Sequence, residues 1–132
     1  MKAAPHVGKE LELMLAGEKP LSMFYCGTMN GLEYEYIPEE EFDAYVQSGL
    51  FIKDVFEYEV SENPKIAMKY VLYSLKDEAW RLPALKLVIQ VMSKIGRTEE
   101  SIDRIIGKLL GYSDKEIDDY IEAGRHTVYL GR

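Results

Sequence analysis

Residues 97–124 read RTEESIDRIIGKLLGYSDKEIDDYIEAG and contain the clearest helical pattern of the chain. Apolar residues recur at helical spacing in two runs, 102–110 and 117–121, and each run predicts an amphipathic helix. Between the runs, Ser113 and Glu116 have the spacing of a capping box, in which two side chains complete the hydrogen bonds at a helix start. The stretch therefore predicts two helices joined by a tight turn, an αα-hairpin.

Four segments upstream have the patterns of β-strands: 21–26, 32–36, 50–60 and 66–75. A compact apolar run predicts that the first strand is buried, and tyrosine alternating with glutamate predicts that the second has one aromatic and one charged face. An Asn-Gly pair separates the first two strands, and a Ser-Glu-Asn-Pro turn separates the last two. Each pair therefore predicts an antiparallel hairpin.

Three further segments predict helices, 9–16, 38–48 and 83–95, and each has a proline or glycine at a boundary. The last of these is apolar over most of its circumference, so we expect it to be buried on more than one side. We expect Gly124 to end the final helix. The tail 126–130 would then be a short edge strand or an ordered extension.

These elements follow the order α-β-β-α-β-β-α-α-α, which predicts an α+β fold. Its core would be a four-stranded, mainly antiparallel sheet made of two hairpin-like pairs, packed with helices and followed by a three-helix carboxy-terminal segment. We expect one domain over residues 1–132, because the chain has no repeat, linker or low-complexity tract. Residues 1–8 have no pattern and are expected to be loose, with His6 an exposed bystander.

The chain has a net charge of −7, and its acidic residues are unevenly placed. Between Glu33 and Glu62 there are ten acidic residues and one basic residue, Lys53, so this segment carries −9. Such a band repels nucleic acid and anionic membranes and attracts basic partners. A solvated face that keeps the protein in solution is the ordinary alternative. The candidate partner-binding residues are Glu33, Glu35, Glu57 and Glu59.

No apolar run is long enough to span a membrane, and the amino terminus has no signal-peptide pattern. Cys26 is the single cysteine and cannot form an internal disulfide, which fits a reducing compartment. We therefore expect no membrane association and a cytoplasmic location. To act as a nucleophile, Cys26 would need a base, and the candidate, His126, is distant in the sequence. We therefore interpret Cys26 as a small, buried apolar residue.

The sequence motifs do not favour catalysis at a metal or a phosphate group. The two histidines and one cysteine have no metal-binding spacing. Residues 27–31 are flanked by predicted strands, and they lack the Lys-Ser/Thr of a phosphate-binding loop and the three-glycine dinucleotide spacing. We expect no catalytic residues, no metal and no cofactor, and an enzyme is the less favoured class.

Ten tyrosines are many for a chain of this length. A tyrosine side chain combines a large apolar ring with a hydroxyl group, which suits the lining of a pocket. Tyr34, Tyr36 and Tyr58 lie on predicted strands and are the candidate ligand-binding residues. Packing of the sheet against the helices is the ordinary alternative.

Three functions follow, in decreasing order of support. The first is a non-enzymatic protein-interaction module with an acidic surface, such as an inhibitor or an immunity-like partner of a basic protein. The second is a small-molecule binder or enzyme with a tyrosine-lined cleft. The third is nucleic-acid binding through the hairpin 102–121, in which residues 105–117 resemble a helix-turn-helix in outline. Charge opposes the third function, because 114–122, the expected recognition helix, has five acids and one base.

Overall fold

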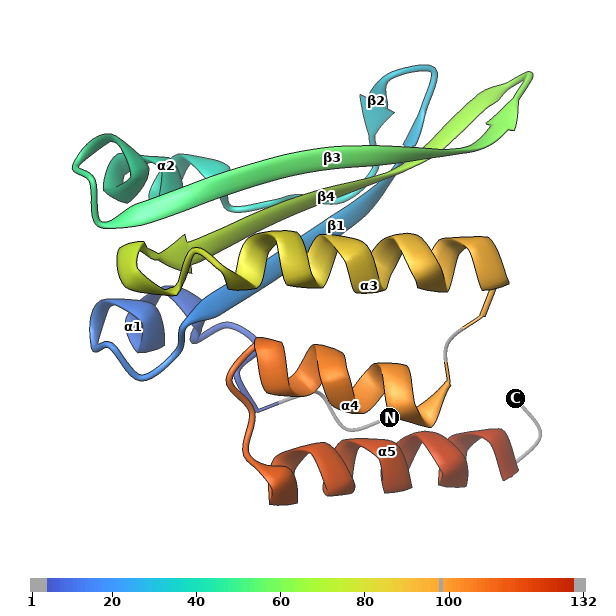
Figure 1. Ribbon diagram of the computed structural model, residues 1–132. Coiled ribbons are helices and arrows are strands. Elements are labelled where there is room, and N and C mark those ends of the chain that lie inside the picture. Colours follow the sequence, from blue (N-terminus) through green and yellow to red (C-terminus); the bar gives the residue numbers. More distant parts are fainter. Residues whose placement is uncertain (1–4, 98, 130–132) are drawn as a thin grey trace. The chain divides into compact units, whose positions relative to one another are not determined.

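The computed structural model describes residues 5–97 and 99–129, with side chains as far as Gly124. Its elements are α1 (Glu10–Leu15), β1 (Leu21–Met29), β2 (Leu32–Glu33), α2 (Glu39–Gln47), β3 (Phe51–Glu62), β4 (Lys65–Leu75), a 3₁₀ turn (Lys76–Glu78), α3 (Arg81–Ile95), α4 (Glu100–Leu109) and α5 (Asp114–Tyr129). The predicted α+β fold is confirmed, with a four-stranded antiparallel sheet and three helices at the carboxy terminus (Figure 1).

The chain divides into two compact units, which we call the sheet unit and the helical unit. The sheet unit is Leu21–Leu82, and the helical unit combines Met1–Pro20 with Pro83–Arg132. Each unit is described by itself below. That the whole chain forms one domain stays a prediction.

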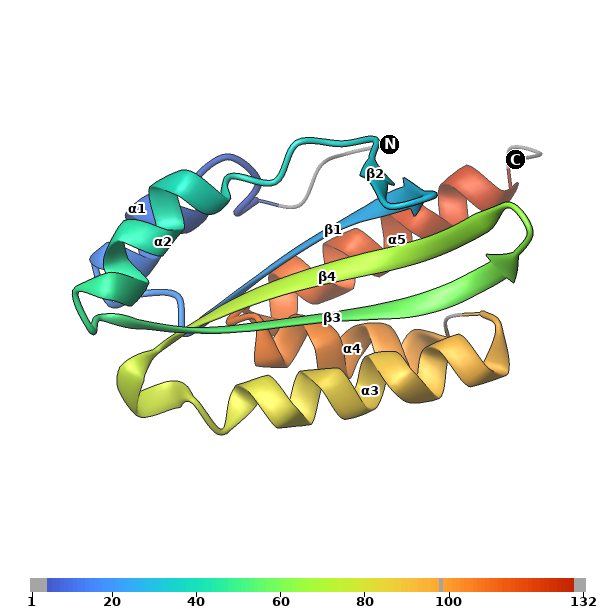
Figure 2. The same ribbon diagram turned by 90° about the horizontal axis from the view of Figure 1, so that it is seen from above.

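In the sheet unit the strand order is β2-β1-β4-β3. The two predicted hairpins are joined through β1 and β4, which pair from Leu21 opposite Ser74 to Met29 opposite Ile66. The short β2 and the long β3 are the outer strands (Figure 2). A register shift between Glu59 and Ser61 interrupts the β3–β4 ladder near its hairpin end.

Helix α2 packs on one face of this sheet, which we call the α2 face (Figure 1). Phe42 of α2 stacks on Tyr73 of β4, with ring centroids 4.8 Å apart, and meets Phe24 of β1 edge to face at 5.1 Å. Phe42 and Tyr73 are buried, so these rings form the core of the unit. Because side chains alternate along a strand, residues of the other parity lie on the opposite face of the sheet.

The second strand is shorter than the sequence predicts. Asn30 and Gly31 form the hairpin turn with φ values of 50° and 85°, the left-handed conformation that an Asn-Gly pair tolerates. β2 then ends at Glu33, whereas alternation predicts a strand over 32–36. Tyr34 N still donates to the Gly27 carbonyl oxygen of β1 at 3.1 Å, and the chain then leads to α2, whose first residue forms ion pairs with the sheet. Long-range contacts of α2 thus override the local alternation.

In the helical unit, α4 and α5 form the predicted hairpin. The capping box is confirmed, because Ser113 Oγ accepts a hydrogen bond from Glu116 N at 3.1 Å and Glu116 Oε1 accepts one from Ser113 N at 2.8 Å. The helices approach closely at Gly107, where an added Cβ would lie 2.7 Å from a side-chain carbon of Ile117. A larger residue at 107 would therefore force the Ile117 side chain to move.

The carboxy-terminal boundary differs from the prediction. α5 continues to Tyr129, so Gly124 does not end the helix and 126–129 are not a strand. Gly124 is absent from the glycines with positive φ, whereas Gly111, after α4, has a φ of 90°. A glycine ends a helix only when it takes the left-handed conformation, and its presence alone does not show this. The prediction for residue 130 lies outside the described residues.

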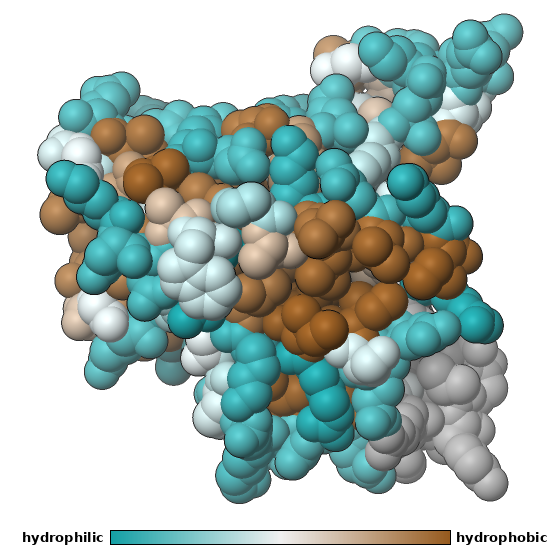
Figure 3. Space-filling model, viewed as in Figure 1, coloured by the Kyte–Doolittle hydropathy of each residue, from teal (hydrophilic) through white to brown (hydrophobic). Residues whose placement is uncertain are grey.

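Helix α3 is buried along one stripe only, and the expectation of burial on several sides was wrong. Leu85 and Ile89 are fully buried, whereas Leu87, Val91 and Ile95 are 61%, 44% and 47% exposed. Figure 3 shows the resulting apolar surface over α3. Within the described part of the chain, no helix is both long enough and apolar enough to cross a membrane.

Candidate functional site

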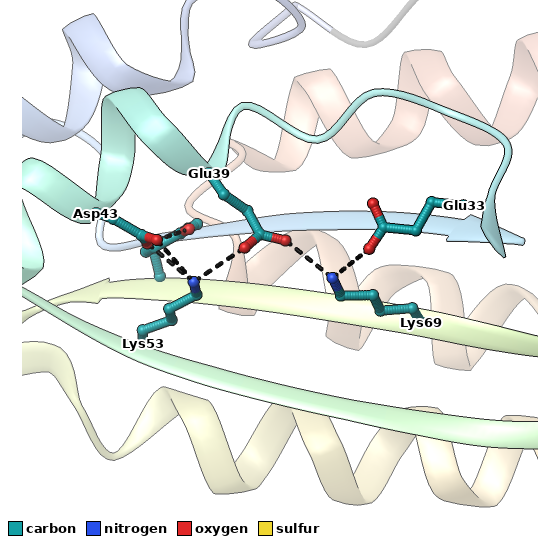
Figure 4. Close-up of polar contacts among 6 residues, drawn as sticks. Glu33, Glu39, Asp43, Lys53 and Lys69 are labelled. Carbon is teal, nitrogen blue, oxygen red and sulfur yellow. Dashed lines mark hydrogen bonds and ion pairs between the residues drawn. The ribbon is translucent and has the colours of Figure 1, made fainter. Parts of the chain in front are cut away.

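An ion-pair network lies on the α2 face and joins α2, β2, β3 and β4 (Figure 4). Its members are Glu33, Glu39, Asp43, Lys53, Lys69 and Tyr73. Lys69 Nζ lies 3.0 Å from Glu39 Oε1 and also pairs with Glu33. Lys53 Nζ lies 3.2 Å from Glu39 Oε2 and 2.9 Å from Asp43 Oδ1. Glu39, at the start of α2, therefore bridges two lysines from neighbouring strands.

The network favours the ionised forms of Glu39, Asp43, Lys53 and Lys69. Burial by itself would raise the pKa of Glu39, but hydrogen bonds from Lys69 and Lys53 outweigh burial and lower it. Burial would also raise the pKa of Asp43, but its hydrogen bonds and the positive charge of Lys53 together outweigh burial and lower it. The hydrogen bond to Glu33 outweighs burial and raises the pKa of Lys69. Burial opposes charge on Lys53 as well, but its carboxylate partners raise its pKa.

Tyr73 completes the network, and its hydroxyl donates to Asp43 Oδ1 at 2.8 Å. Burial, followed by this hydrogen bond, raises the pKa of Tyr73 above its ordinary value. The tyrosine is therefore neutral and the lysines are cationic near neutral pH. General acid–base catalysis needs a group whose pKa lies near the working pH, and these shifts move the lysines and Tyr73 away from it. The arrangement is suited to holding α2 and β2 on the sheet.

Most of the predicted partner-binding residues lie on the α2 face, as the register of the strands shows. Glu33, Glu57 and Glu59 share the α2 face, on strands to either side of Lys69. Glu33 is paired with Lys69, whereas Glu57 and Glu59 are exposed. Glu35 lies in the segment between β2 and α2 and is also exposed. Three of the four predicted residues thus lie on one side of the sheet.

Net charge is divided unequally between the two units. The sheet unit contains twelve acidic and five basic residues and carries −7. The helical unit contains eleven of each and is neutral. The acidic character of the protein therefore belongs to the sheet unit alone.

The three predicted ligand-binding tyrosines are not brought together. Tyr34 and Tyr36 lie between β2 and α2 and are 63% and 77% exposed. The hydroxyl of Tyr36 donates to Glu41 of α2, 3.0 Å from both carboxylate oxygens. Tyr58 lies on the opposite face of the sheet, where its ring centroid is 5.9 Å from that of Tyr70. Whether any of them binds a ligand stays a prediction.

The aromatic residues on that opposite face form a cluster that the sequence indicated only in part. Its members are Tyr25, Phe56, Tyr58 and Tyr70. Phe56 stacks on Tyr70, with centroids 5.3 Å apart, and Tyr25 meets Tyr70 at 5.6 Å. The sequence does not indicate Tyr25, because it lies in a continuous apolar run that does not show which residues share a face. These rings contact one another across three adjacent strands.

Cys26 is fully buried on the α2 face, and its expected burial is confirmed. Burial, together with the negative charge of Glu33, raises the pKa of its thiol. Since the thiolate is the nucleophilic form, these surroundings oppose reactivity.

A second cluster of polar side chains lies in the helical unit. Lys19 is only 2% exposed, and its Nζ donates to the Leu110 carbonyl oxygen at 2.6 Å and contacts His6 Nδ1 at 2.8 Å. The ring of His6 stacks on Tyr112 with centroids 3.8 Å apart, and its Nε2 lies 3.9 Å from Glu116 Oε2. The side chain of His6 is 12% exposed, so the expectation of an exposed bystander was wrong.

Burial lowers the pKa of Lys19 to about 8. Burial, followed by the positive charge of Lys19, lowers the pKa of His6, so a neutral imidazole accepts the hydrogen bond from the ammonium group. An amine with this pKa could exchange protons near neutral pH, but Lys19 is closed to solvent and already bonded. No local pattern indicated this cluster, because Leu110 lies 91 residues from Lys19 in the sequence.

Comparisons of the chain with protein-family models, with curated proteins and with solved structures give no significant match. Among the described residues, no group of three or more histidine, cysteine, aspartate or glutamate side chains is arranged to hold a metal ion. The inference of function therefore depends on charge, exposure and register.

Proposed function

We propose that this protein is a non-enzymatic binding module and that its sheet unit binds a basic protein partner. The observation that carries the proposal is the division of charge: the sheet unit holds the entire net charge of −7, and the helical unit is neutral. Opposite potentials on two partners accelerate encounter and suppress wrong partners. An inhibitor or immunity-like protein of a basic enzyme fits this description.

The exposed carboxylates of the sheet unit are the proposed contacts. Glu33, Glu39 and Asp43 are engaged by lysines, whereas Glu57 and Glu59 are exposed and have no ion pair within the described part of the chain. A partner's lysines and arginines could therefore bind these two without breaking the ion-pair network. The single cysteine agrees with a reducing location, and we propose the cytoplasm.

Binding of nucleic acid through α4 and α5 is a weaker proposal. Arg104 Nη1 lies 2.6 Å from Asp118 Oδ1, and Lys108 pairs with Asp114, so basic side chains of α4 are engaged by acidic side chains of α5. Phosphate binding would require basic side chains that are available to the backbone of the nucleic acid. The acidic second helix opposes that function.

A pair of charge-matched variants tests the proposed function. Glu57→Gln/Glu59→Gln removes two exposed carboxylates from the sheet unit, and Glu12→Gln/Glu18→Gln removes two exposed carboxylates from the helical unit. Each variant and the parent protein would be immobilised and presented with a set of small basic proteins and with cell lysate. Raising the ionic strength to about 1 M shortens the screening length to about 3 Å and should release a charge-driven partner.

We expect the Glu57/Glu59 variant to lose capture of the basic partner and the Glu12/Glu18 variant to keep it. Equal capture by the two variants would show that the sheet-unit carboxylates are not the contact. Absence of any partner that binds at low salt and leaves at high salt would remove the proposed function itself.

A further inference from the structure

β3 is an outer strand with one open side. It extends over Phe51–Glu62, and among the described residues it pairs only with β4 (Figure 2). An outer strand presents a row of backbone N–H and C=O groups to any extended chain that approaches. Binding by strand addition uses such an edge, with backbone hydrogen bonds supplying affinity and alternate side chains supplying specificity.

The side chains of this strand indicate which chain would fit. Phe56-Glu57-Tyr58-Glu59 alternates aromatic and acidic residues. The aromatic pair lies on one face of the sheet, and the acidic pair lies exposed on the α2 face. Directly opposite residues on adjacent strands share a face, so a complementary strand would place basic residues beside the acids and apolar residues beside the rings.

We propose that β3 binds a basic, extended segment of a partner protein, which adds to the sheet as a further strand beside 52–59. This inference rests on the proposed function and gives the partner a specific chemistry: a segment in which lysine or arginine alternates with apolar residues. Ile52 is 37% exposed and extends the apolar contact on the aromatic face toward the start of the strand, whereas Val55, 45% exposed, lies on the α2 face with Glu57.

A second copy of this chain fits the same edge less well. Pairing of the two 56–59 segments with each other would bring the acidic side chains of both copies together on one face. Like charges on opposing strands are destabilising, and acidic side chains are one way in which outer strands avoid pairing with themselves. Charge complementarity therefore favours a basic partner over self-association.

Amide hydrogen exchange on the full chain tests the proposal. The probe is a synthetic peptide that alternates lysine and valine and is capped at both ends. At a peptide concentration about ten times its Kd, amides of 52–59 that point away from β4 should exchange roughly tenfold more slowly. The control peptide has the same composition with its lysines grouped at one end and its valines at the other. It should not slow these amides.

Matched protein variants separate the edge from general charge attraction. Glu57→Gln/Glu59→Gln should weaken binding of the alternating peptide at least about threefold, and Glu12→Gln/Glu18→Gln should leave it nearly unchanged. Peptide binding without protection of β3 would overturn the strand-addition site and leave the acidic binding function standing. Failure of the peptide to bind, while basic proteins are still captured at low salt, would likewise overturn the strand-addition site and leave the acidic binding function standing. Protection of the β3 amides in the free protein that grows with protein concentration would identify a second copy as the occupant and would also overturn the proposal.

Discussion

Lys19 in the helical unit and Lys69 in the sheet unit are both largely withdrawn from solvent, but their ammonium groups contact different kinds of partner. Lys69 contacts two carboxylates, of Glu39 and Glu33, whereas Lys19 contacts a carbonyl oxygen and an imidazole nitrogen. The pKa of Lys69 is raised and that of Lys19 is lowered. Burial disfavours charge in both places, so the presence of a bonded carboxylate decides the direction of the shift.

The two units differ in the same way at their surfaces. In the sheet unit, acidic residues outnumber basic residues, and the carboxylates of Glu57 and Glu59 are exposed, where a partner can reach them. In the helical unit, acids and bases are equal in number, and the ion pairs between α4 and α5 satisfy several of them. The sheet unit is therefore the better candidate for a charged partner, and four measurements would sharpen or break this comparison.

The largest expected effect is at the buried lysine. Lys19→Ala removes the donor to the Leu110 carbonyl and leaves a cavity, so the free energy of unfolding should fall by about 2–4 kcal/mol. Lys115→Ala is the control, because its side chain is 84% exposed, and it should change stability by less than about 0.5 kcal/mol. Urea denaturation measures both. Similar small losses would show that the buried contacts of Lys19 contribute little.

The second effect is a rise in stability with pH. Lys19 has a pKa of about 8 in the folded chain and an ordinary value of 10.5, so the unfolded state binds more protons between these values. Stability should therefore increase from pH 8 to about 9.5, by up to about 2 kcal/mol from this group, before tyrosines ionise. Denaturation curves across this range measure the slope. Lys19→Met should lose this rise, and an unchanged slope would contradict the assignment to Lys19.

A smaller effect is expected in the ion-pair network. Lys69→Ala deprives Glu33 and Glu39 of a cation and should lower the free energy of unfolding by about 1–2 kcal/mol. Lys65→Ala, at an exposed position of the same strand, is the control. The substitution at Lys69 should also raise the pKa of Glu39, measured by NMR titration. A Glu39 pKa that does not move would show that the contact with Lys69 is not formed in solution.

The smallest effect on stability should come from the proposed contact residues. Glu57→Gln/Glu59→Gln changes exposed side chains without an ion pair in the described residues, so stability should stay within about 0.5 kcal/mol of the parent. Thermal unfolding checks this. A large loss would mean that these carboxylates support the fold, and the binding measurements on this variant would then lose their meaning.

Features set by neighbouring residues could be predicted from the sequence. The capping box at Ser113 and Glu116, the turn at Asn30 and Gly31 and the alternation of β3 all depend on residues a few positions apart. Local geometry is enough for them, because side-chain and backbone partners are within reach before the chain folds. The α+β class and the position of most elements follow from such patterns.

Other features depended on contacts between distant residues. The early end of β2 and the pairing of Lys69 with Glu33, 36 residues away, follow from the docking of α2 and the strand register. The Lys19 cluster joins residues 91 positions apart, and no local pattern marks it. The sequence by itself determined which residues carry charge and which elements form. Only the tertiary structure decided which carboxylates are neutralised and which remain exposed, because burial and hydrogen bonding are properties of the packed chain.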